Sequence, residues 1–139
     1  MGEWDHSWIQ AELIGFFRGL RERLRCYAVP EQRVQVKPTR FRIPDVMVSI
    51  GKPGEQIITQ PPFLVVEVLS PEDRASNVQE KITDYLDFGV PYVWVVDPRT
   101  RRAYVHTAGG ALEAKDGVLR TAGPELSVPL AEIFQALDE

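Results

Sequence analysis

The amino-acid sequence predicts an α/β (α+β) protein with a mixed sheet, formed by one domain that spans residues 1–139. Three observations lead to this prediction. Residues 62–70 form an apolar, β-branched run, which is typical of a strand buried on both faces. Residues 92–97 form a second run of this type, and the segment between the two has helical periodicity. Strands that alternate with helices in this way build a sheet on which the helices pack.

Composition excludes several classes of protein. The net charge of −4 argues against a protein that coats nucleic acid non-specifically, although it leaves room for a local basic patch. The single cysteine, Cys26, excludes an internal disulfide and a cysteine-rich zinc site, and it suits a reducing compartment. No apolar run has the length of a membrane span, and the N-terminal residues lack the core of a signal peptide. We therefore expect a cytoplasmic protein without a membrane segment.

The first element is predicted to be an amphipathic helix, capped by Asp5 or Ser7 and extending to about Arg25. His6 and Glu12 lie within or beside its apolar stripe, and both are candidate auxiliary site residues. The alternative is that they lie at the solvent-facing edge of the stripe. The apolar residues that define the stripe are Ile9, Leu13, Phe16, Phe17, Leu20 and Leu24.

Strands are expected from Tyr27 onward. Residues 32–37 alternate polar and apolar side chains, as an edge strand does. A turn over residues 38–40 leads to a strand over 41–50, which Pro44 and Asp45 interrupt. A glycine- and proline-containing loop then leads to the central strand, residues 62–70.

The second half of the chain begins with a helix that Ser76 or Asn77 caps and that Gly89 closes after Phe88. The buried strand at 92–97 follows. We expect residues 103–107 and the segments around Leu112 and Val118 to form a small C-terminal hairpin region, and a short amphipathic helix to end the chain. The apolar residues of this last helix are Leu130, Ile133, Phe134 and Leu137.

The central strand contains one carboxylate, Glu67. An isolated ionised carboxylate in a buried strand costs several kcal/mol unless a cation, a donor or a metal compensates it. If residues 46–50 and 62–66 pair around a loop centred near Gln56, Asp45 lies directly opposite Glu67, with Cβ atoms about 5 Å apart. A slip of one residue would separate them. Two facing carboxylates require either a proton or a cation between them.

The following helix offers that cation. Its apolar side chains cover one arc and its acidic side chains, including Asp84, lie on the opposite side, yet Lys81 falls within the apolar arc. One interpretation is that the stem of Lys81 is buried while its ammonium reaches solvent. The other is that Lys81 points toward Asp45 and Glu67. Two acids and a lysine at one edge of a sheet would form a site for a hard cation, Mg²⁺ or Mn²⁺.

Several of these motifs together resemble a known family. Pro44-Asp45, Glu67 within Val-Glu-Val-Leu-Ser-Pro, Lys81 with Tyr85, and the Gly-Val-Pro-Tyr-Val-Trp-Val-Val-Asp-Pro block over 89–98 resemble the Uma-type family of restriction-endonuclease-like proteins. The resemblance implies the PD-(D/E)xK nuclease fold, with Asp45 and Glu67 as metal-binding acids. The general pattern has lysine two residues after the second acid, where this sequence has Leu69. The resemblance therefore implies that Lys81 takes the lysine role, with Tyr85 as a possible auxiliary residue.

The function expected from these features is Mg²⁺-dependent hydrolysis of DNA phosphodiester bonds, with Asp45, Glu67 and Lys81 as catalytic residues. A homodimer is expected, because one small domain with a single site cannot cut both strands of a duplex. The alternative is a non-catalytic module on the same fold that binds nucleic acid or a protein. The residues expected to contact DNA are Arg18, Arg21, Arg40 and Arg42.

Overall fold

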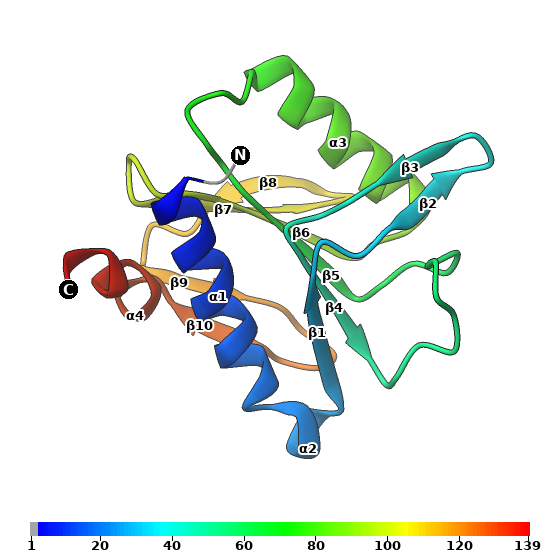
Figure 1. The fold of residues 1–139 in the computed structure, drawn as a ribbon, viewed down its shortest axis with the longest axis horizontal. Helices are drawn as coiled ribbons and strands as arrows, with labels where there is room; N and C mark the ends of the chain where they lie inside the picture. The colour runs from blue at the N-terminus through cyan, green and yellow to red at the C-terminus, as the bar shows by residue number, and fades with distance from the viewer. Residues whose placement is uncertain (1–2) are drawn as a thin grey trace.

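The computed structural model describes residues 3–139, so the first two residues of the predicted domain 1–139 lie outside it. A six-stranded sheet forms the centre of the fold, with the strand order β1-β4-β5-β6-β7-β8 (Figure 1). Neighbouring strands are antiparallel except β5 and β6, which are parallel, so the predicted mixed sheet is confirmed. The strands are β1 (Cys26–Pro30), β4 (Val46–Ile50), β5 (Leu64–Val68), β6 (Tyr92–Asp97), β7 (Arg102–Thr107) and β8 (Gly110–Glu113).

One face of the sheet is covered by α1 (Trp4–Arg18), together with α4 (Leu130–Gln135), the 3₁₀ helix η1 (Ala136–Asp138) and a small sheet of β9 (Val118–Arg120) and β10 (Ser127–Pro129). Phe17 packs on Trp94 of β6, with ring centroids 5.9 Å apart. The predicted first helix is divided, because α1 ends at Arg18 and a separate short α2 (Arg21–Leu24) follows Gly19. Neither predicted side-chain cap forms, since Glu3 occupies the N-cap position without a side-chain hydrogen bond.

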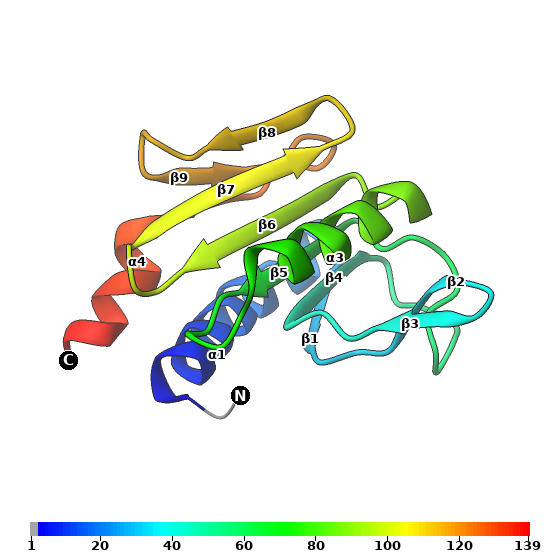
Figure 2. The same cartoon turned by 90° about the horizontal axis from the view of Figure 1, so that it is seen from above.

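The other face is covered by α3 (Ala75–Phe88) and by a hairpin of β2 (Val34–Lys37) and β3 (Arg40–Arg42) (Figures 1 and 2). Helix α3 connects the two parallel strands, as a crossover helix does. It begins with Arg74 at the N-cap position, so the cap predicted at Ser76 or Asn77 is wrong. It ends at Gly89, whose φ of 109° is the left-handed conformation expected there.

Three strand predictions need correction. The predicted strand over 41–50 is two elements, because β3 belongs to the hairpin and β4 to the central sheet, with Pro44 between them. Proline cannot donate to a ladder, so it separates the two pairings. Strands β7 and β8 continue the central sheet rather than forming a separate C-terminal hairpin region, and β9 pairs with β10, which was not predicted. No helix in the described part of the chain is long and apolar enough to cross a membrane.

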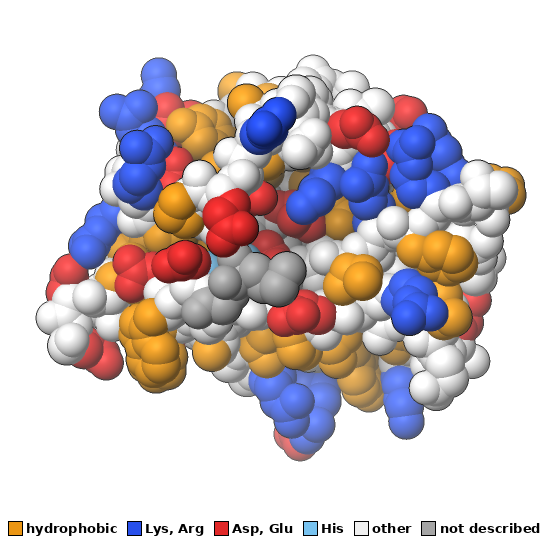
Figure 3. Space-filling view, turned by 45° about the horizontal axis from the view of Figure 1, so that its top comes forward, with side chains coloured by type: hydrophobic (Ala, Val, Ile, Leu, Met, Phe, Trp, Pro, Cys, Tyr) orange, Lys and Arg blue, Asp and Glu red, His pale blue; other side chains and the backbone are white. Residues whose placement is uncertain are grey.

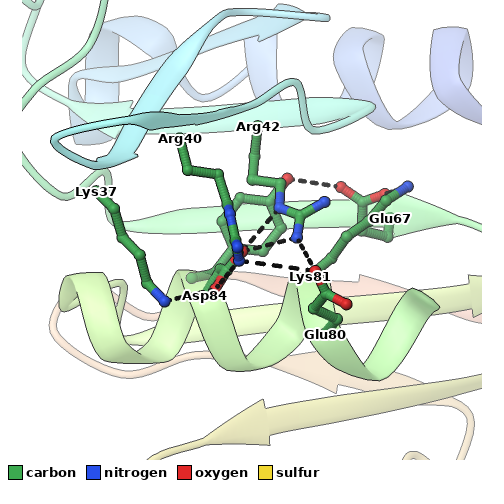
Figure 4. Close-up of polar contacts among 8 residues, drawn as sticks. Lys37, Arg40, Arg42, Glu67, Glu80, Lys81 and Asp84 are labelled. Atoms are coloured by element: carbon green, nitrogen blue, oxygen red, sulfur yellow. Dashed lines mark hydrogen bonds and ion pairs between the residues drawn. The ribbon is translucent and has the colours of Figure 1, made fainter. Parts of the chain in front are cut away.

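Ion pairs and hydrogen bonds hold the β2–β3 hairpin on α3. Asp84 of α3 accepts hydrogen bonds from Arg40 Nη1 at 3.0 Å and from Arg42 Nε at 2.9 Å, and Lys37 Nζ lies 3.5 Å from its carboxylate (Figure 4). Asp84 is only 2% exposed, although the sequence places it on the side of the helix opposite the apolar arc. Helical periodicity places a residue relative to its own helix and contains no information about a hairpin that covers it.

Asp84 is therefore expected to stabilise the fold. Burial alone would raise its pKa, but the hydrogen bonds from Arg42 and Arg40 outweigh burial and hold the pKa below the usual 3.8. Asp84→Ala should lower the free energy of unfolding by about 2 kcal/mol at pH 7, because it leaves the two guanidinium groups with only the exposed carboxylate of Glu80. The difference from wild type should shrink below about pH 3.8, where Asp84 takes up a proton.

Urea unfolding at several pH values measures this effect, with Asp87→Ala as the control, since Asp87 is an exposed aspartate of the same helix. Equal destabilisation by both substitutions would show that the charge cluster does not hold the hairpin.

Candidate active site

The register of β4 and β5 brings two carboxylates together at one end of the sheet. Val46 pairs with Val66 and Val48 with Leu64, so the next position in the same register places Asp45 opposite Glu67. The register predicted from the symmetric hairpin is thus confirmed. Directly opposed residues share a face of the sheet. That face is the α3 side, because the neighbouring Met47 and Val65 pack in the cluster beneath α3.

Helix α3 supplies two partners for the Glu67 carboxylate. The Tyr85 hydroxyl donates to Oε2 at 3.0 Å. Lys81 Nζ lies 3.7 Å from Oε1 (Figure 4). Lys81 and Tyr85 are four residues apart, so they lie on the same side of the helix. The side chain of Lys81 is about one-third exposed, and its ammonium lies against Glu67. The structure therefore brings Glu67, Lys81 and Tyr85 together.

The electrostatics of Glu67 follow from its burial, since it is only 6% exposed. Burial, followed by the negative charge of Asp45, raises the pKa of Glu67 to about 7, although Lys81 and the Tyr85 hydroxyl oppose the shift. Burial and the charge of Glu67 raise the pKa of Tyr85, so its hydroxyl remains a neutral donor. A cation placed beside both carboxylates would offset both the burial and the repulsion from Asp45 that keep a proton on Glu67.

Asp45 is held from several directions. Its Oδ2 accepts a hydrogen bond from the Val68 N–H at 2.7 Å, and its Oδ1 lies 3.2 Å from His6 Nε2. The hydrogen bond to Asp45 raises the pKa of His6, which favours the imidazolium form. The first turn of α1 therefore reaches the carboxylate pair, and His6 joins the site.

Gln10 is a site residue that the sequence did not reveal. Its side-chain amide donates to the main-chain carbonyl of Asp45 at 2.7 Å, and the residue is only 9% exposed. A signal was present, because Gln10 is one helical turn after His6 and one turn before Leu13, within the apolar stripe. A polar residue in such a position needs a partner in the interior.

The remaining candidates lie apart from the carboxylates. Glu12 is half-buried on α1, and no contact joins it to Asp45 or Glu67 among the described residues. Arg18 lies about 18 Å along α1 from His6, given a rise of 1.5 Å per residue. Arg21 lies beyond it in α2.

The other two arginines, Arg40 and Arg42, form ion pairs with Asp84 and Glu80 beside the site. Figure 3 shows basic side chains on the hairpin side of this face, next to acidic side chains at its centre. The four arginines therefore do not form one continuous patch, and their contact with DNA stays a prediction.

A cavity of about 920 Å³ opens beside His6. It lies between the start of α1, the start of α3 and the face of β7. Asp45, Glu67 and Lys81 do not line it, so the carboxylate pair is next to this cavity and not inside it. Its walls include Trp4, Val78, Ile82, Asp97, Tyr104 and His106.

The donor set fits a hard divalent cation. Among residues 3–139, no group of three or more His, Cys, Asp or Glu side chains could hold a metal ion. Mg²⁺, however, is commonly bound by one or two carboxylates, with water and substrate phosphate oxygens completing the octahedron. Two facing carboxylates whose repulsion a cation would relieve match that mode of binding. Asp45 and Glu67 are thus the residues that would hold it.

Comparison with known proteins agrees with this fold. The chain belongs to the family described as "Uma2: Putative restriction endonuclease", whose model matches residues 1–136. It is similar in structure to a protein from Anabaena variabilis described as "a putative nuclease belonging to DUF820", with a TM-score of 0.84 and 21% sequence identity. The similarity covers 99% of this chain and 84% of the other. No protein with a curated description matched the chain.

The raised pKa of Glu67 leads to a prediction about stability without metal. The folded state binds a proton more tightly than the unfolded state, so stability is lost as the pH rises from about 4.5 through 7. Between pH 4.5 and 8 in EDTA, wild type should lose about 3 kcal/mol relative to Glu67→Gln, which carries no charge.

Urea unfolding of wild type and variant at both pH values measures this difference. Glu125→Gln is the control, because Glu125 is exposed and its substitution should leave the pH dependence of wild type intact. If Glu67→Gln follows the same pH dependence as wild type, Glu67 does not hold a proton near neutral pH.

Proposed function

We propose that this protein is a metal-dependent endonuclease. Its active site, formed by Asp45, Glu67 and Lys81, hydrolyses DNA phosphodiester bonds. The observation that supports this function best is the opposition of Asp45 and Glu67 across β4 and β5, with the Lys81 ammonium beside Glu67. Membership of the family described as "Putative restriction endonuclease" supports the same class of reaction. Mg²⁺ or Mn²⁺ is the proposed cofactor because both acids are hard oxygen donors.

Each residue of the site has a defined task in this proposal. When bound, the metal supplies positive charge that polarises the scissile phosphate and lowers the pKa of a water molecule. Asp45 and Glu67 bind it, and the Val68 N–H and the Tyr85 hydroxyl keep their carboxylates oriented. Lys81 orients the attacking water or offsets the negative charge that develops on the phosphate oxygens.

DNA is the proposed partner, and cleavage of both strands requires two copies of the site. We propose a homodimer, because β8 is an edge strand of the central sheet and Leu112 on it is 78% exposed. We place the protein in the cytoplasm, where its buried Cys26 would stay reduced.

Metal binding is expected to require both acids. In titration calorimetry with Mn²⁺ at pH 7.5, Asp45→Asn and Glu67→Gln should each weaken binding at least about tenfold, since each removes a charged ligand. Asp73→Asn is the control, because Asp73 is an exposed carboxylate close to the pair that accepts a hydrogen bond from the Ser70 N–H. If all three variants bind Mn²⁺ as wild type does, the metal site is not formed by Asp45 and Glu67.

Lys81 is expected to act in the reaction and not in folding. Lys81→Ala should lower DNA cleavage about 100-fold, by analogy with the loss of one transition-state donor. It should leave Mn²⁺ affinity unchanged or raised, because a repelling cation is removed. Stability should change little, since alanine is a good helix former.

Nuclease assays on plasmid and single-stranded DNA measure this effect, and Lys115→Ala serves as the control, because Lys115 is an exposed lysine outside the site. Cleavage that is undiminished in Lys81→Ala alone would remove Lys81 from the mechanism. If the two single variants, Lys81→Ala and Glu67→Gln, both cleave DNA as wild type does, the nuclease function is contradicted and a non-catalytic binding module is favoured.

The proposed dimer predicts twice the monomer mass of 15.7 kDa in light scattering at micromolar concentration. Leu112→Lys should shift the population toward monomer, because charged residues on an edge strand oppose pairing. A monomer in wild type would rule out this assembly.

A further inference from the structure

We propose that Gln10 is a positioning residue, which holds the main chain of Asp45 and thereby sets the place of its carboxylate at the metal site. This inference rests on the proposed function, because it takes Asp45 as a metal ligand. Three observations support the inference: the position of Asp45 in the sheet, the contacts of its carbonyl oxygen, and the conformation of the neighbouring Glu31.

Asp45 lies just outside the regular ladder of the sheet. The pairing of β4 with β5 begins at Val46, and Pro44, which precedes Asp45, has no N–H to donate. The main chain at Asp45 therefore lacks the repeated hydrogen bonds that hold the interior of a strand. A metal ligand at such a point needs another restraint, because a shift of the main chain moves the carboxylate with it.

Gln10 provides that restraint. The Asp45 carbonyl oxygen accepts from Gln10 Nε2 at 2.7 Å, and from the Glu31 N–H at 3.4 Å. The first distance is that of a good hydrogen bond, whereas the second is at the long limit. Gln10 is buried on α1, so its amide is placed by the packing of the helix on the sheet. Helix α1 thus holds Asp45 at two atoms, through His6 at Oδ1 and through Gln10 at the main chain.

Glu31 supports the same arrangement. Pro30 pairs with Val46, so the next position places Glu31 opposite Asp45 on the other side of β4. In an extended strand its carboxylate would share a face with Asp45 and Glu67 and add a third negative charge. Glu31 instead has a φ of 51°, an uncommon left-handed conformation, and its Oε2 lies 3.4 Å from the amide nitrogen of Gln10. The side chain of Glu31 is therefore directed to the residue that holds Asp45.

The test compares Mn²⁺ affinity and stability in two variants that remove the donor. Gln10→Met keeps the length and helix propensity of the side chain, and Gln10→Glu is isosteric but has no hydrogen to donate when ionised. Both should weaken Mn²⁺ binding about tenfold in titration calorimetry at pH 8, as loss of a group that orients a ligand does. Gln35→Met is the matched control, because the Gln35 amide also donates to a main-chain carbonyl, that of Pro38 in the hairpin, at 2.9 Å.

The outcomes separate this inference from the proposed function. Weaker Mn²⁺ binding in the folded Gln10 variants, with Gln35→Met as wild type, supports the positioning role. If Gln10→Met and Gln10→Glu lose stability but bind Mn²⁺ as tightly as wild type, while Asp45→Asn does not, Gln10 is only structural and the inference is wrong. If wild type shows no saturable Mn²⁺ binding, the metal site and this inference both fail.

Discussion

The burial of the Glu67 carboxylate beside Asp45 is the constraint on which the rest of the structure depends. Both carboxylates lie at the end of a sheet that is covered on two faces, and Glu67 belongs to a strand with no exposed residue. Glu67 is almost completely removed from water, so the protein must compensate its charge. Helix α3 contributes Lys81 and Tyr85 from one layer, and α1 contributes His6 from the other. The packing of both helices is therefore inseparable from the electrostatics of the site.

Much of this site could be predicted from the sequence because each central residue breaks a local pattern. Glu67 is the only charge in an apolar strand, and Lys81 is the only charge in the apolar arc of its helix. The position of Asp45 opposite Glu67 was predicted from the symmetry of the hairpin, and the structure has the same register. Such exceptions are informative, since a buried charge without a partner would destabilise the fold. The family blocks around Glu67 and Trp94 then identified the fold.

The parts that the sequence did not reveal depend on contacts between distant elements. Gln10 is 35 positions from Asp45, and nothing near either residue specifies that they meet. Asp84 looked like an ordinary solvent-facing aspartate until the β2–β3 hairpin was placed over α3. The end of α1 at Arg18 was missed for a different reason, because apolar periodicity continues through Leu20 and Leu24 while the backbone does not.

The ion pairs between the hairpin and α3 differ in exposure, and this difference determines which pairs a polyanion could replace. Glu80 has an exposed side chain, so its pairs with Arg40 and Arg42 are hydrated and weak. Asp84 is buried, and separating it from the same two guanidinium groups would leave its charge with Lys37 alone, whose Nζ lies 3.5 Å away. A phosphate arriving at this surface would therefore exchange with Glu80 first and leave the bonds to Asp84 intact. The proposed contact of the two arginines with DNA is therefore compatible with the attachment of the hairpin to the helix that carries Lys81.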